Sequence, residues 1–505
     1  MSTPTSSPWL SNDSDRKAEP LTRDRRCDVC VVGGGIAGLT TAYLLAEAGQ
    51  SVVLLEANEV VAGGESAYTT AHLAWVLDDR FARLKSIRGA EVAKAAADSH
   101  RSAIDLIEAI ADTEGIACEF ERLDGYLVPG SHNGAVVIDK EEAALRDLDL
   151  PFERSDRCPL PALSSGACLR FAGQGQFHPL KYLTGLAAAV RRRGRDIHTG
   201  TRVTKIEGGS PCRVETEGGH TVTAASVVIA TGAPFDAGVM LHAKLAAYTT
   251  YAVGIDVPKG SVPNALYWDT EDPYHYVRVH PGAGDAADLL IVGGEDHKTG
   301  QASDQEERWG RLVSWARNRV PEAGEVRHRW SGQVFETPDG LGLIGRAPWG
   351  DNLYVITGDS GLGLTHGTLG ARLVTNLIRG DADPLAGVYS PSRWMPAALL
   401  TLLGENLNLA AQFTDWLTGG DVGSVEEIPA GHGAIVRSGL GKLAVYRDEA
   451  GAVTRLNAAC PHMGGVVRWN PGEKSWDCPC HGSRFTCTGE VLHGPAVRPL
   501  QRAET

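Results

Sequence analysis

The clearest hydrophobic pattern lies near the start of the chain. An apolar run over residues 29–32 predicts a buried strand, and a helical pattern from about 36 to 47 predicts a helix. A second apolar run over 52–55 predicts another buried strand, which ends at Glu56. Strand, helix and strand in this order predict a βαβ unit, and therefore an α/β domain with parallel strands.

The pattern changes toward the other end of the chain. From about residue 425, short stretches alternate between apolar and polar positions, as in GAIVRSG, GKLAVYRDEAG and AVTRLNAAC. A period of two predicts strands, and DEAG at 448–451 predicts a hairpin turn between two of them. The last 80 residues are therefore expected to form a small all-β domain.

A largely apolar stretch separates these two regions. Residues 395–417 read MPAALLTLLGENLNLAAQFTDWL, and polar side chains interrupt them at Glu405, Asn406, Asn408 and Asp415. No uncharged run of eighteen apolar residues occurs in the chain, so we expect no membrane span. The stretch is predicted to be a helical connector that packs against the rest of the protein.

These patterns divide the 505 residues into four parts. Residues 1–25 are polar and rich in Pro and Ser, which predicts a disordered tail and no secretion signal. Residues 26–395 are expected to form the large α/β region, interleaved with an α+β substrate domain. Residues 396–424 are expected to be the helical linker, and residues 425–505 the small all-β domain.

The charge balance narrows the choice of partners. The formal net charge is −14, which argues against nucleic acid and anionic membranes as main partners. The ten Cys show no disulfide-framework spacing, which favours a reducing, cytoplasmic setting. Neither number identifies a substrate.

The first turn of the predicted βαβ unit carries GxGxxG, as Gly33, Gly35 and Gly38. The first glycine permits the tight turn, the second lets the backbone approach a pyrophosphate, and the third lets helix and strand pack closely. The helix N-terminus offers unpaired N–H groups to the phosphates. Glu56, 23 residues after Gly33, stands where an acid accepts hydrogen bonds from ribose hydroxyls. The unit therefore predicts a dinucleotide site.

Four further segments indicate which dinucleotide is bound. They read AGGESAYTTAHL (62–73), VTAASVVIATGAP (222–234), TPDGLGLIG (337–345) and DNLYVITGDSGLGLTHGTLG (351–370). In this order they resemble the glutathione-reductase-like FAD proteins, and most closely the amine-oxidising flavoenzymes of the D-amino-acid-oxidase and glycine-oxidase type. The resemblance implies FAD. Because one dinucleotide fingerprint is present, a second site for NAD(P)H is not evident.

The resemblance also implies which residues hold the FAD. In that family the late Gly-Asp segment lies along the ribityl chain and flavin, and the Ala-Thr-Gly strand flanks the adenine half. The implied residues are Gly33, Gly35, Ile36, Ala37, Gly38, Glu56, Ala57, Thr70, Ala71, Val203, Ala230, Thr231, Gly232, Gly358, Asp359, Gly361 and Thr365.

Two Cys and two His recur in the C-terminal domain, Cys460 with His462 and Cys478 with His481. Four N and S ligands could hold a tetrahedral zinc ion. One thiolate and one imidazole from each loop also suit a Rieske [2Fe–2S] centre. The order C-P-C-H-G-S closely resembles Rieske domains, which implies the iron–sulfur cluster.

Nearly the whole chain resembles a bacterial group of FAD-dependent oxidoreductases that carry a C-terminal Rieske domain. One departure concerns the cluster loops, because that group usually has a Cys where this chain has Gly465, and Cys480 would be its disulfide partner. Phe485 also replaces the Tyr that donates a hydrogen bond in high-potential clusters. Fewer donors to the sulfurs lower the reduction potential, so we expect a value in the low or middle part of the Rieske range.

The resemblance implies oxidation of a C–N bond in an amine or amino-acid-like substrate, by hydride transfer to FAD. A flavin accepts two electrons at once and a Rieske cluster carries one, so single-electron transfer between them is expected. The direction stays open, since an external protein either accepts or donates the electrons. Two alternatives also stay open: a cluster-fed reductase or monooxygenase-like enzyme, and a redox carrier or sensor without a small substrate.

The candidate catalytic residues lie mainly in EDPYHYVRVH at 271–280. As a strand, this segment places Tyr274, Tyr276, Arg278 and His280 on one face and His275 on the other. The two tyrosines are candidates for the pocket wall, and Arg278 for a bidentate contact with a substrate carboxylate. The alternative is an aromatic-rich sheet strand with a surface Arg. Further candidates near the flavin are His366, His72, Asp296, His297 and Lys298.

The same segment contains a spacing that mononuclear iron sites use in Rieske oxygenases. Asp272, His275 and His280 form D-x2-H-x4-H. Because a strand would place the two histidines on opposite faces, they could not bind one iron together. We therefore expect no iron site here.

Overall fold

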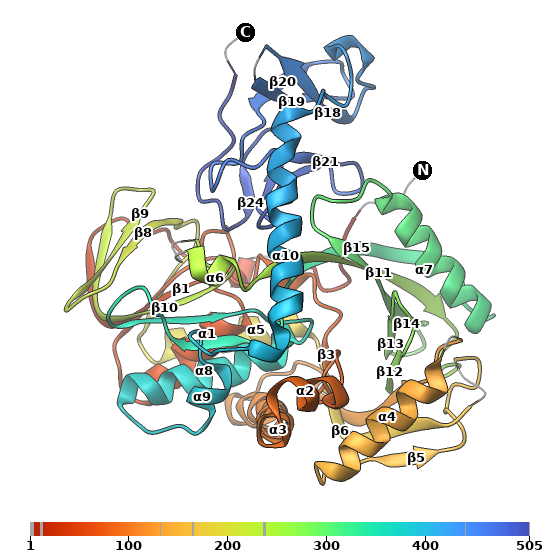
Figure 1. The fold of residues 1–505 in the computed structure, drawn as a ribbon. Helices are drawn as coiled ribbons and strands as arrows, with labels where there is room; N and C mark the ends of the chain where they lie inside the picture. The colour runs from red at the N-terminus through yellow and green to blue at the C-terminus, as the bar shows by residue number, and fades with distance from the viewer. Residues whose placement is uncertain are drawn as a thin grey trace.

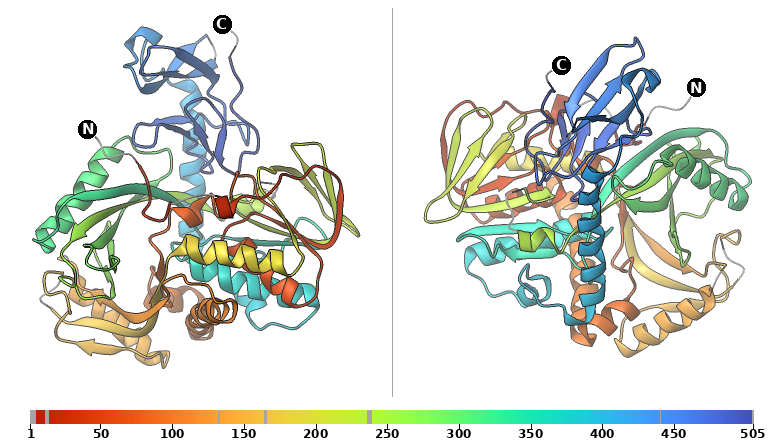
Figure 2. Two further views of the ribbon diagram at one scale, coloured as in Figure 1. Left: turned by 180° about the vertical axis from the view of Figure 1, so that it is seen from behind. Right: turned by 45° about the horizontal axis from the view of Figure 1, so that its top comes forward.

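Two large sheets form the body of the protein, and a smaller all-β unit stands on top of them (Figure 1; Figure 2). The computed structural model describes residues 5–10, 14–131, 133–163, 166–235, 239–439 and 441–503. No helix among these residues is long and apolar enough to cross a bilayer.

The first sheet contains the βαβ unit predicted from the sequence. Its strands follow the order β16-β17-β10-β1-β2-β7, and β8 and β9 extend it from β10. The pairs β1–β2, β1–β10, β10–β17 and β2–β7 are parallel. The strands are β1 (Arg25–Val32), β2 (Val52–Leu55), β7 (Asp196–His198), β8 (Val203–Glu207), β9 (Cys212–Thr216), β10 (Thr221–Gly232), β16 (Leu343–Arg346) and β17 (Leu353–Thr357).

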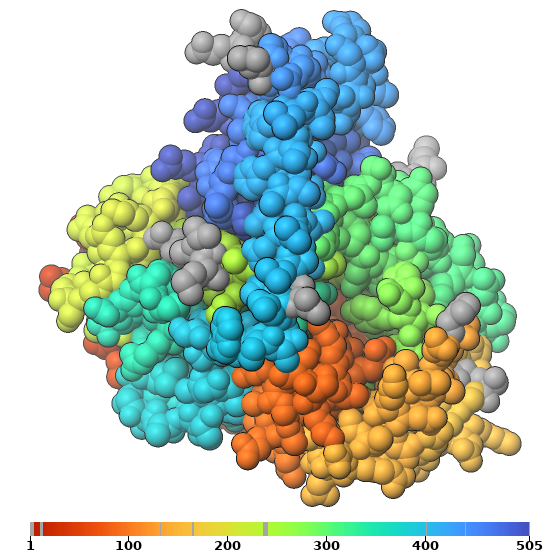
Figure 3. Space-filling view, viewed as in Figure 1, coloured from red at the N-terminus to blue at the C-terminus, as the bar shows by residue number. Residues whose placement is uncertain are grey.

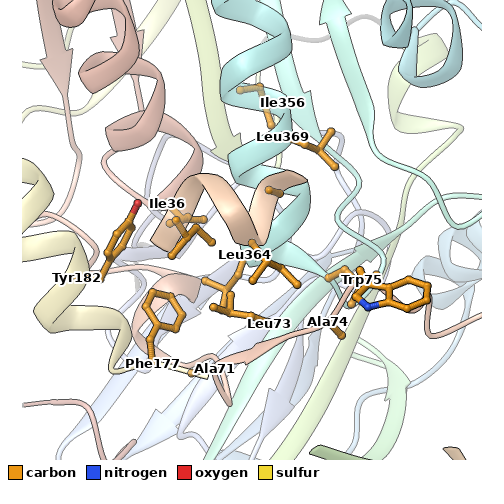
Figure 4. Packing of buried hydrophobic residues seen from close by; sticks show 14 of the residues in the cluster. Ile36, Ala71, Leu73, Ala74, Trp75, Phe177, Tyr182, Ile356, Leu364 and Leu369 are labelled. Atoms are coloured by element: carbon orange, nitrogen blue, oxygen red, sulfur yellow. The ribbon is translucent and has the colours of Figure 1, made fainter. Parts of the chain in front are cut away.

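Helices cover one face of this sheet, as the apolar runs of its strands require. α1 (Ile36–Glu47) packs against α5 (Pro179–Arg192) and α8 (Gly363–Arg379), and α3 (Ala90–Glu114) packs against α8. The buried residues between them form the main core, which Figure 4 shows from close by. Ile36 at the start of α1 and Leu364 and Leu369 on α8 point into this core together with Leu73.

The second sheet is mainly antiparallel and follows the order β15-β11-β14-β13-β12-β4-β6-β3, with β5 paired to β6. α7 (Gln305–Arg319) packs on β11 and β14, and α4 (Gly134–Asp147) packs on β4 and β6. The strands are β3 (His72–Leu73), β4 (Glu121–Val128), β5 (Glu153–Ser155), β6 (Cys168–Gln176), β11 (Ala246–Val257), β12 (Leu266–Asp269), β13 (His275–His280), β14 (Asp288–Lys298) and β15 (Val326–Glu336).

The C-terminal unit is all-β, as its alternating pattern predicts. One sheet has the order β18-β19-β20 and the other the order β21-β22-β23-β24. Trp476, Phe485 and Leu456 have no exposed surface and lie in its core. Its strands are β18 (His432–Ser438), β19 (Gly441–Arg447), β20 (Val453–Asn457), β21 (Arg468–Asn470), β22 (Ser475–Asp477), β23 (Arg484–Thr486) and β24 (Val491–His493).

The connector is helical, but it is less well packed than expected. α10 (Leu399–Gln412) runs along the front of the molecule from the body to the C-terminal unit (Figure 1; Figure 3). Leu403 and Leu407, one turn apart, are 49% and 71% exposed. One apolar face of α10 therefore lies open to solvent, whereas its polar Asn408 bonds to Gln301 on the body.

The expectation of a disordered tail is wrong for the part of residues 1–25 that the structure describes. Trp9 has no exposed surface, and its indole nitrogen donates to the Thr69 carbonyl at 2.6 Å. Ser6 pairs with Arg329 at the edge of β15. The polar composition of this segment predicted disorder, but composition does not register single anchoring side chains. The apolar contact of one buried Trp is enough to order the residues around it.

A buried ion pair joins two segments beside the first sheet. The Arg393 guanidinium donates to both carboxylate oxygens of Asp339, at 2.9 and 2.7 Å, and Arg88 donates to the same carboxylate. The side chains of Arg393 and Asp339 are 3% and 0% exposed. Two guanidinium groups therefore depend on one carboxylate for their charge partner.

We expect Asp339→Ala to lower the free energy of unfolding by about 3–5 kcal/mol, because it leaves buried guanidinium charge unpaired. Denaturant unfolding followed by tryptophan fluorescence measures this. Asp147→Ala is the matched control, since Asp147 pairs with Lys85 at the surface and the expected cost is below about 1 kcal/mol. Equal losses in the two variants would contradict the prediction.

Candidate functional site

A cavity of about 340 Å³ lies where the two sheets meet. The first sheet lines it with the ends of three strands, through Gly33, Gly232 and Gly358. The second sheet contributes side chains such as Thr250 on β11 and Tyr276 on β13. Carboxyl ends of parallel strands are the usual ligand edge of such a sheet, so this cavity is the candidate site.

The glycine-rich turn leaves room for a ligand's phosphates. Gly33 has a φ of +108°, and a Cβ there would lie 2.3 Å from the Ala230 carbonyl oxygen. A Cβ on Gly38 would lie 1.8 Å from the Gly33 carbonyl oxygen, so helix and strand touch at this point. Gly35 caps α1 without a side chain, which leaves the helix N-terminus facing the cavity. This cradle fits a dinucleotide pyrophosphate.

Glu56 supports the same turn from the end of β2. One carboxylate oxygen accepts from the Gly34 N–H at 2.6 Å, and the other accepts from the Asn58 N–H at 2.8 Å. Burial raises the pKa of the Glu56 carboxyl above its ordinary value, although these two N–H groups act to lower it. Glu56 also lines the cavity, as a ribose contact requires.

Most of the residues expected to hold FAD line the cavity, and three do not. Gly38 lies beneath the turn, where it serves the close packing of helix and strand. Ala71 is fully buried. The Thr365 hydroxyl, also buried, bonds to His100 Nδ1 at 2.7 Å and faces the core. Ser66 lines the cavity but was not predicted from the sequence. Its hydroxyl oxygen accepts a hydrogen bond from the Ile36 N–H at 3.1 Å, at the start of α1.

Two tyrosines wall the end of the cavity that lies on the second sheet. The rings of Tyr274 and Tyr276 lie 5.7 Å apart, and the Tyr276 hydroxyl lies 2.9 Å from the Thr250 hydroxyl. A Cβ on Gly293 would lie 2.2 Å from the Tyr276 ring, so the ring rests directly on β14. Both tyrosines line the cavity, and burial raises the pKa of each hydroxyl.

Arg278 does not line this cavity, contrary to the role expected for it. It is 1% exposed, and its guanidinium donates to the carbonyl oxygens of Thr70 and Ala71 at 3.2 and 2.8 Å. It also lies over the Trp9 ring. Arg278 lies on β13 two residues after Tyr276. Tyr276 lines the cavity, and Arg278 lies beyond its edge. Through these two carbonyl oxygens Arg278 braces the segment that carries Thr70, which lines the cavity.

His366 lines the cavity, but the main chain engages its ring on both sides. Nε2 accepts from the Gly342 N–H at 3.1 Å, and Nδ1 lies 2.8 Å from the Asp359 carbonyl oxygen, to which it therefore donates. Burial lowers the pKa of His366 to about 4. The neutral ring thus holds the turn around Asp359, and neither nitrogen is directed at a substrate.

The three residues with iron-like spacing do not come together. His275 bonds to Asp269 at 3.0 Å and stacks on Trp315, whereas His280 lies edge-on to Trp9. The two histidines therefore occupy opposite faces of β13, as strand geometry predicts.

The two cluster loops lie side by side at the end of the C-terminal unit that packs against the body. Each is a tight turn, closed by hydrogen bonds from Cys460 N to Gly465 O at 2.8 Å and from Cys478 N to Ser483 O at 2.7 Å. The imidazole rings of His462 and His481 lie 5.0 Å apart. His481 Nδ1 is buried and has no hydrogen-bond partner among the described residues. Two buried thiols with two neighbouring imidazoles fit a Rieske cluster, whose second iron takes two His.

The loops preserve the geometry of a disulfide whose first Cys is absent. A Cβ on Gly465 would lie 3.4 Å from Cys480 Cβ and 2.4 Å from its sulfur. Disulfides hold their Cβ atoms roughly 3.5–4.5 Å apart. Cys480 and Cys487 are both free thiols. Phe485 is fully buried and has no hydroxyl that could donate to a cluster sulfur. A reduction potential in the low or middle part of the Rieske range remains our prediction for the cluster.

We therefore expect Gly465→Cys to form a disulfide with Cys480 under a glutathione redox buffer, in which oxidised glutathione accepts the two electrons. Thiol titration of the denatured protein should find two thiols fewer than in the reduced variant. A loop of this length should stabilise the unit by up to about 3 kcal/mol. The double variant Gly465→Cys/Cys480→Ser is the control, and equal thiol losses in both would contradict the pairing.

The C-terminal unit shares a wall with the cavity. Its residues Leu492, His493, Gly494, Ala496 and Val497 line the cavity, and His493 Nε2 lies 3.2 Å from Glu65 Oε1.

Gln333 on β15 reaches from this cavity to the cluster loops. It lines the cavity, and its side-chain amide donates to the Gly482 carbonyl oxygen at 2.8 Å, next to His481.

His242, on the short helix α6 (Val239–His242) after β10, contacts both cluster histidines. Its ring lies 4.7 Å from that of His462 and 5.3 Å from that of His481. These long-range contacts had no signal in the sequence.

Two family profiles match the chain. The one described as FAD dependent oxidoreductase matches residues 28–377, and the one described as Rieske [2Fe-2S] domain matches residues 420–504. The first covers the sheets around the cavity, and the second covers the C-terminal unit with its two loops.

Two relatives show how far each likeness extends. A Rieske 2Fe-2S iron-sulfur protein of Bacillus subtilis, YhfW, is 31% identical over 98% of this chain and 97% of its own length. Gamma-glutamylputrescine oxidoreductase of Escherichia coli is 28% identical over 72% of this chain and 86% of its own length.

Solved structures share the fold of the larger part. Glycine oxidase from Geobacillus kaustophilus has a TM-score of 0.61 at 21% identity, covering 73% of this chain and 99% of that structure. L-proline dehydrogenase from P. horikoshii has a TM-score of 0.60 at 18% identity, covering 73% and 98%.

Proposed function

Because the chain belongs to the FAD-dependent oxidoreductase family and ends in a Rieske [2Fe-2S] domain, we propose that it oxidises the C–N bond of an amine or amino-acid-like substrate and passes the electrons singly to the cluster. The enzyme binds FAD and a [2Fe–2S] cluster. Bound FAD supplies a hydride acceptor, and the cluster supplies one-electron transfer.

The overall reaction follows from this pairing. The substrate loses a hydride from carbon and a proton from nitrogen, so that the C–N single bond becomes C=N. Two electrons leave with the hydride, and the proton passes to solvent. The hydride would pass to bound FAD, and reoxidation of the flavin would release the hydride's proton to solvent and its two electrons, one at a time, through the cluster to an external acceptor protein.

The names of the relatives support the substrate class. Gamma-glutamylputrescine, glycine and L-proline, the compounds in those names, all carry a C–N bond next to a C–H. The tyrosine wall is the part of this chain that suits such a substrate. Tyr274 and Tyr276 present aromatic surface to the cavity and shield its end from water.

The proposal of electron transfer between the two sites rests on the position of Gln333. One side chain lines the cavity and also donates to the loop that holds His481, so a single residue spans the space between the two cofactor sites. The backbone of β15 carries it there from the second sheet. Short covalent and hydrogen-bonded routes of this kind favour transfer within one chain.

His242 is a further residue of the body that contacts the cluster loops. It lies ten residues after Gly232, which lines the cavity, and its ring touches both cluster imidazoles. We assign Gln333 and His242 to the electron route and Tyr274 and Tyr276 to the substrate pocket. Arg278 and His366 support the pocket wall from behind.

Anaerobic mixing with a panel of amines and amino acids tests the proposal. Bleaching of the flavin absorbance, followed by the EPR signal of the reduced Rieske cluster, is the expected sequence. If no compound bleaches the flavin while a reduced ferredoxin reduces the cluster first, electrons run inward and the proposal is wrong.

A further inference from the structure

Two carboxylates face the tyrosine end of the cavity. Asp78 lies in the turn between β3 and α2 (Phe81–Arg88), and Asp296 lies near the end of β14. Both line the cavity together with Tyr274, Tyr276 and Trp268. Asp78 packs directly on the turn after β17, because a Cβ on Gly361 would lie 2.1 Å from its carboxylate.

The cations that act on these two carboxylates, Arg80 on Asp78 and Arg308 on Asp296, do so without direct contact. Within the parts of the chain that the structure describes, neither forms an ion pair with Lys or Arg within 4.0 Å. Arg308 is the nearest candidate on an adjacent helix, but its guanidinium pairs with Asp304 at 2.8 Å and donates to the Glu295 carbonyl oxygen at 2.6 Å. Asp296 Oδ1 is buried and has no hydrogen-bond partner among the described residues.

The same surroundings penalise the charged form of both groups. Desolvation of its carboxyl group, and then repulsion from Asp296, raises the pKa of Asp78 to about 7, although Arg80 acts to lower it. Burial raises the pKa of Asp296 to about 6. Asp78 is exposed and Asp296 is half-buried. Because the two carboxylates repel each other and neither has a direct cation partner among the described residues, a ligand with positive charge would be favoured between them.

At its tyrosine end the cavity has no Lys or Arg among the described lining residues that could pair with a substrate carboxylate. Among its described lining residues the one Arg or Lys is Arg202, which belongs with Glu56 at the opposite, glycine-rich end. Arg278 is turned toward backbone carbonyls. His72 is neutral, since burial lowers its pKa to about 3. The tyrosine end thus presents carboxylates and the faces of Tyr and Trp rings, which attract ammonium groups.

We propose that the substrate is a diamine-like amine, with a second ammonium group held by Asp78 and Asp296 and no carboxylate beside the reacting C–N bond. This inference rests on the proposed function and names its substrate class. Asp296 supplies the unpartnered acceptor, and the aromatic rings surround the ammonium group.

Three compounds separate the effect of the second ammonium group from the effect of a carboxylate. Putrescine has two amines, n-butylamine lacks the second one, and ornithine is putrescine with a carboxylate beside one amine. Calorimetric titration of the oxidised, anaerobic holoenzyme measures their binding, and flavin bleaching measures their turnover. We expect putrescine to bind at least about 10-fold more tightly than either of the others, because each lost or repelled charge contact weakens binding by that order.

Asp296→Asn and Asp78→Asn test the assignment of the carboxylates. Each should weaken putrescine binding about 10- to 100-fold and leave n-butylamine binding nearly unchanged. Asp124→Asn is the matched control, because Asp124 pairs with Arg170 outside the cavity. The flavin absorbance of each variant verifies that FAD is retained.

The outcomes separate the two proposals. If ornithine or glycine binds and bleaches the flavin better than putrescine, the substrate class is wrong and amine oxidation stands. If putrescine binds equally well to wild type and both Asn variants, the carboxylates are not its site. If putrescine binds at the carboxylates without bleaching the flavin, the site assignment stands and amine oxidation fails.

Discussion

Replacing His481 by Ala is expected to remove the [2Fe–2S] cluster completely while the FAD stays bound. His481 provides one of two neighbouring imidazoles, and its buried Nδ1 has no other partner among the described residues. An iron that loses one of its two protein ligands in such a site is released, along with the sulfides. Iron and acid-labile sulfide analysis should fall from two of each per chain to near zero.

The same variant separates the two halves of the reaction. Substrate should still bleach the flavin, because Tyr274 and Tyr276 are untouched, but no reduced-cluster EPR signal should follow. His432→Ala is the matched control, since His432 lies exposed on β18 of the same unit. Retention of both irons in His481→Ala would refute the ligand assignment.

Gly38→Ala should abolish FAD binding. A Cβ at this position would lie 1.8 Å from the Gly33 carbonyl oxygen, so one added methyl group forces α1 away from β1. That movement displaces the Gly33 turn and the helix N-terminus, which together cradle the pyrophosphate. We expect FAD affinity to fall at least about 100-fold, equivalent to roughly 2.7 kcal/mol.

Flavin content of the purified variant and titration with free FAD measure this loss. Gly310→Ala is the control, because Gly310 also lies in a helix and nothing lies within 4 Å of an added Cβ. A Gly38→Ala protein that purifies yellow with full FAD occupancy would contradict the packing argument.

Local sequence patterns predicted the cofactor sites because those sites are built from local elements. The GxGxxG turn needs one strand and one helix, and Cys460, His462, Cys478 and His481 lie on two short loops of one small unit. The tyrosine face of β13 could be predicted for the same reason, since alternation along a strand fixes which side chains share a face.

What the sequence did not reveal depends on contacts between distant segments. Arg278 lies on the expected face of β13. Its side chain is held outside the cavity by its contacts with the Thr70 carbonyl oxygen and the Trp9 ring, which come from distant segments. Gln333 and His242 carry no motif, and their contacts with the cluster loops form only when the C-terminal unit packs on the body. Polar composition likewise hid Trp9, because burial of one side chain outweighs the composition of its neighbours.

The proximity of Asp78 and Asp296 also depends on contacts between distant segments. The two residues are more than two hundred positions apart and lie in different segments that both line the cavity. Asp296 was named among the further candidates near the flavin, whereas Asp78 had no signal in the sequence. A substrate pocket assembled from several segments therefore requires the tertiary structure.

The most direct test of the central claim is the rate at which the cluster is reduced after rapid photoreduction of the flavin. The wild-type protein should give a first-order rate constant that is independent of protein concentration, because Gln333 lines the cavity and bonds to a cluster loop of the same chain. Gln333→Ala should slow this step and leave substrate bleaching of the flavin unchanged. A rate that rises in proportion to protein concentration, or cluster reduction only with an added mediator, would show that the two sites are not connected.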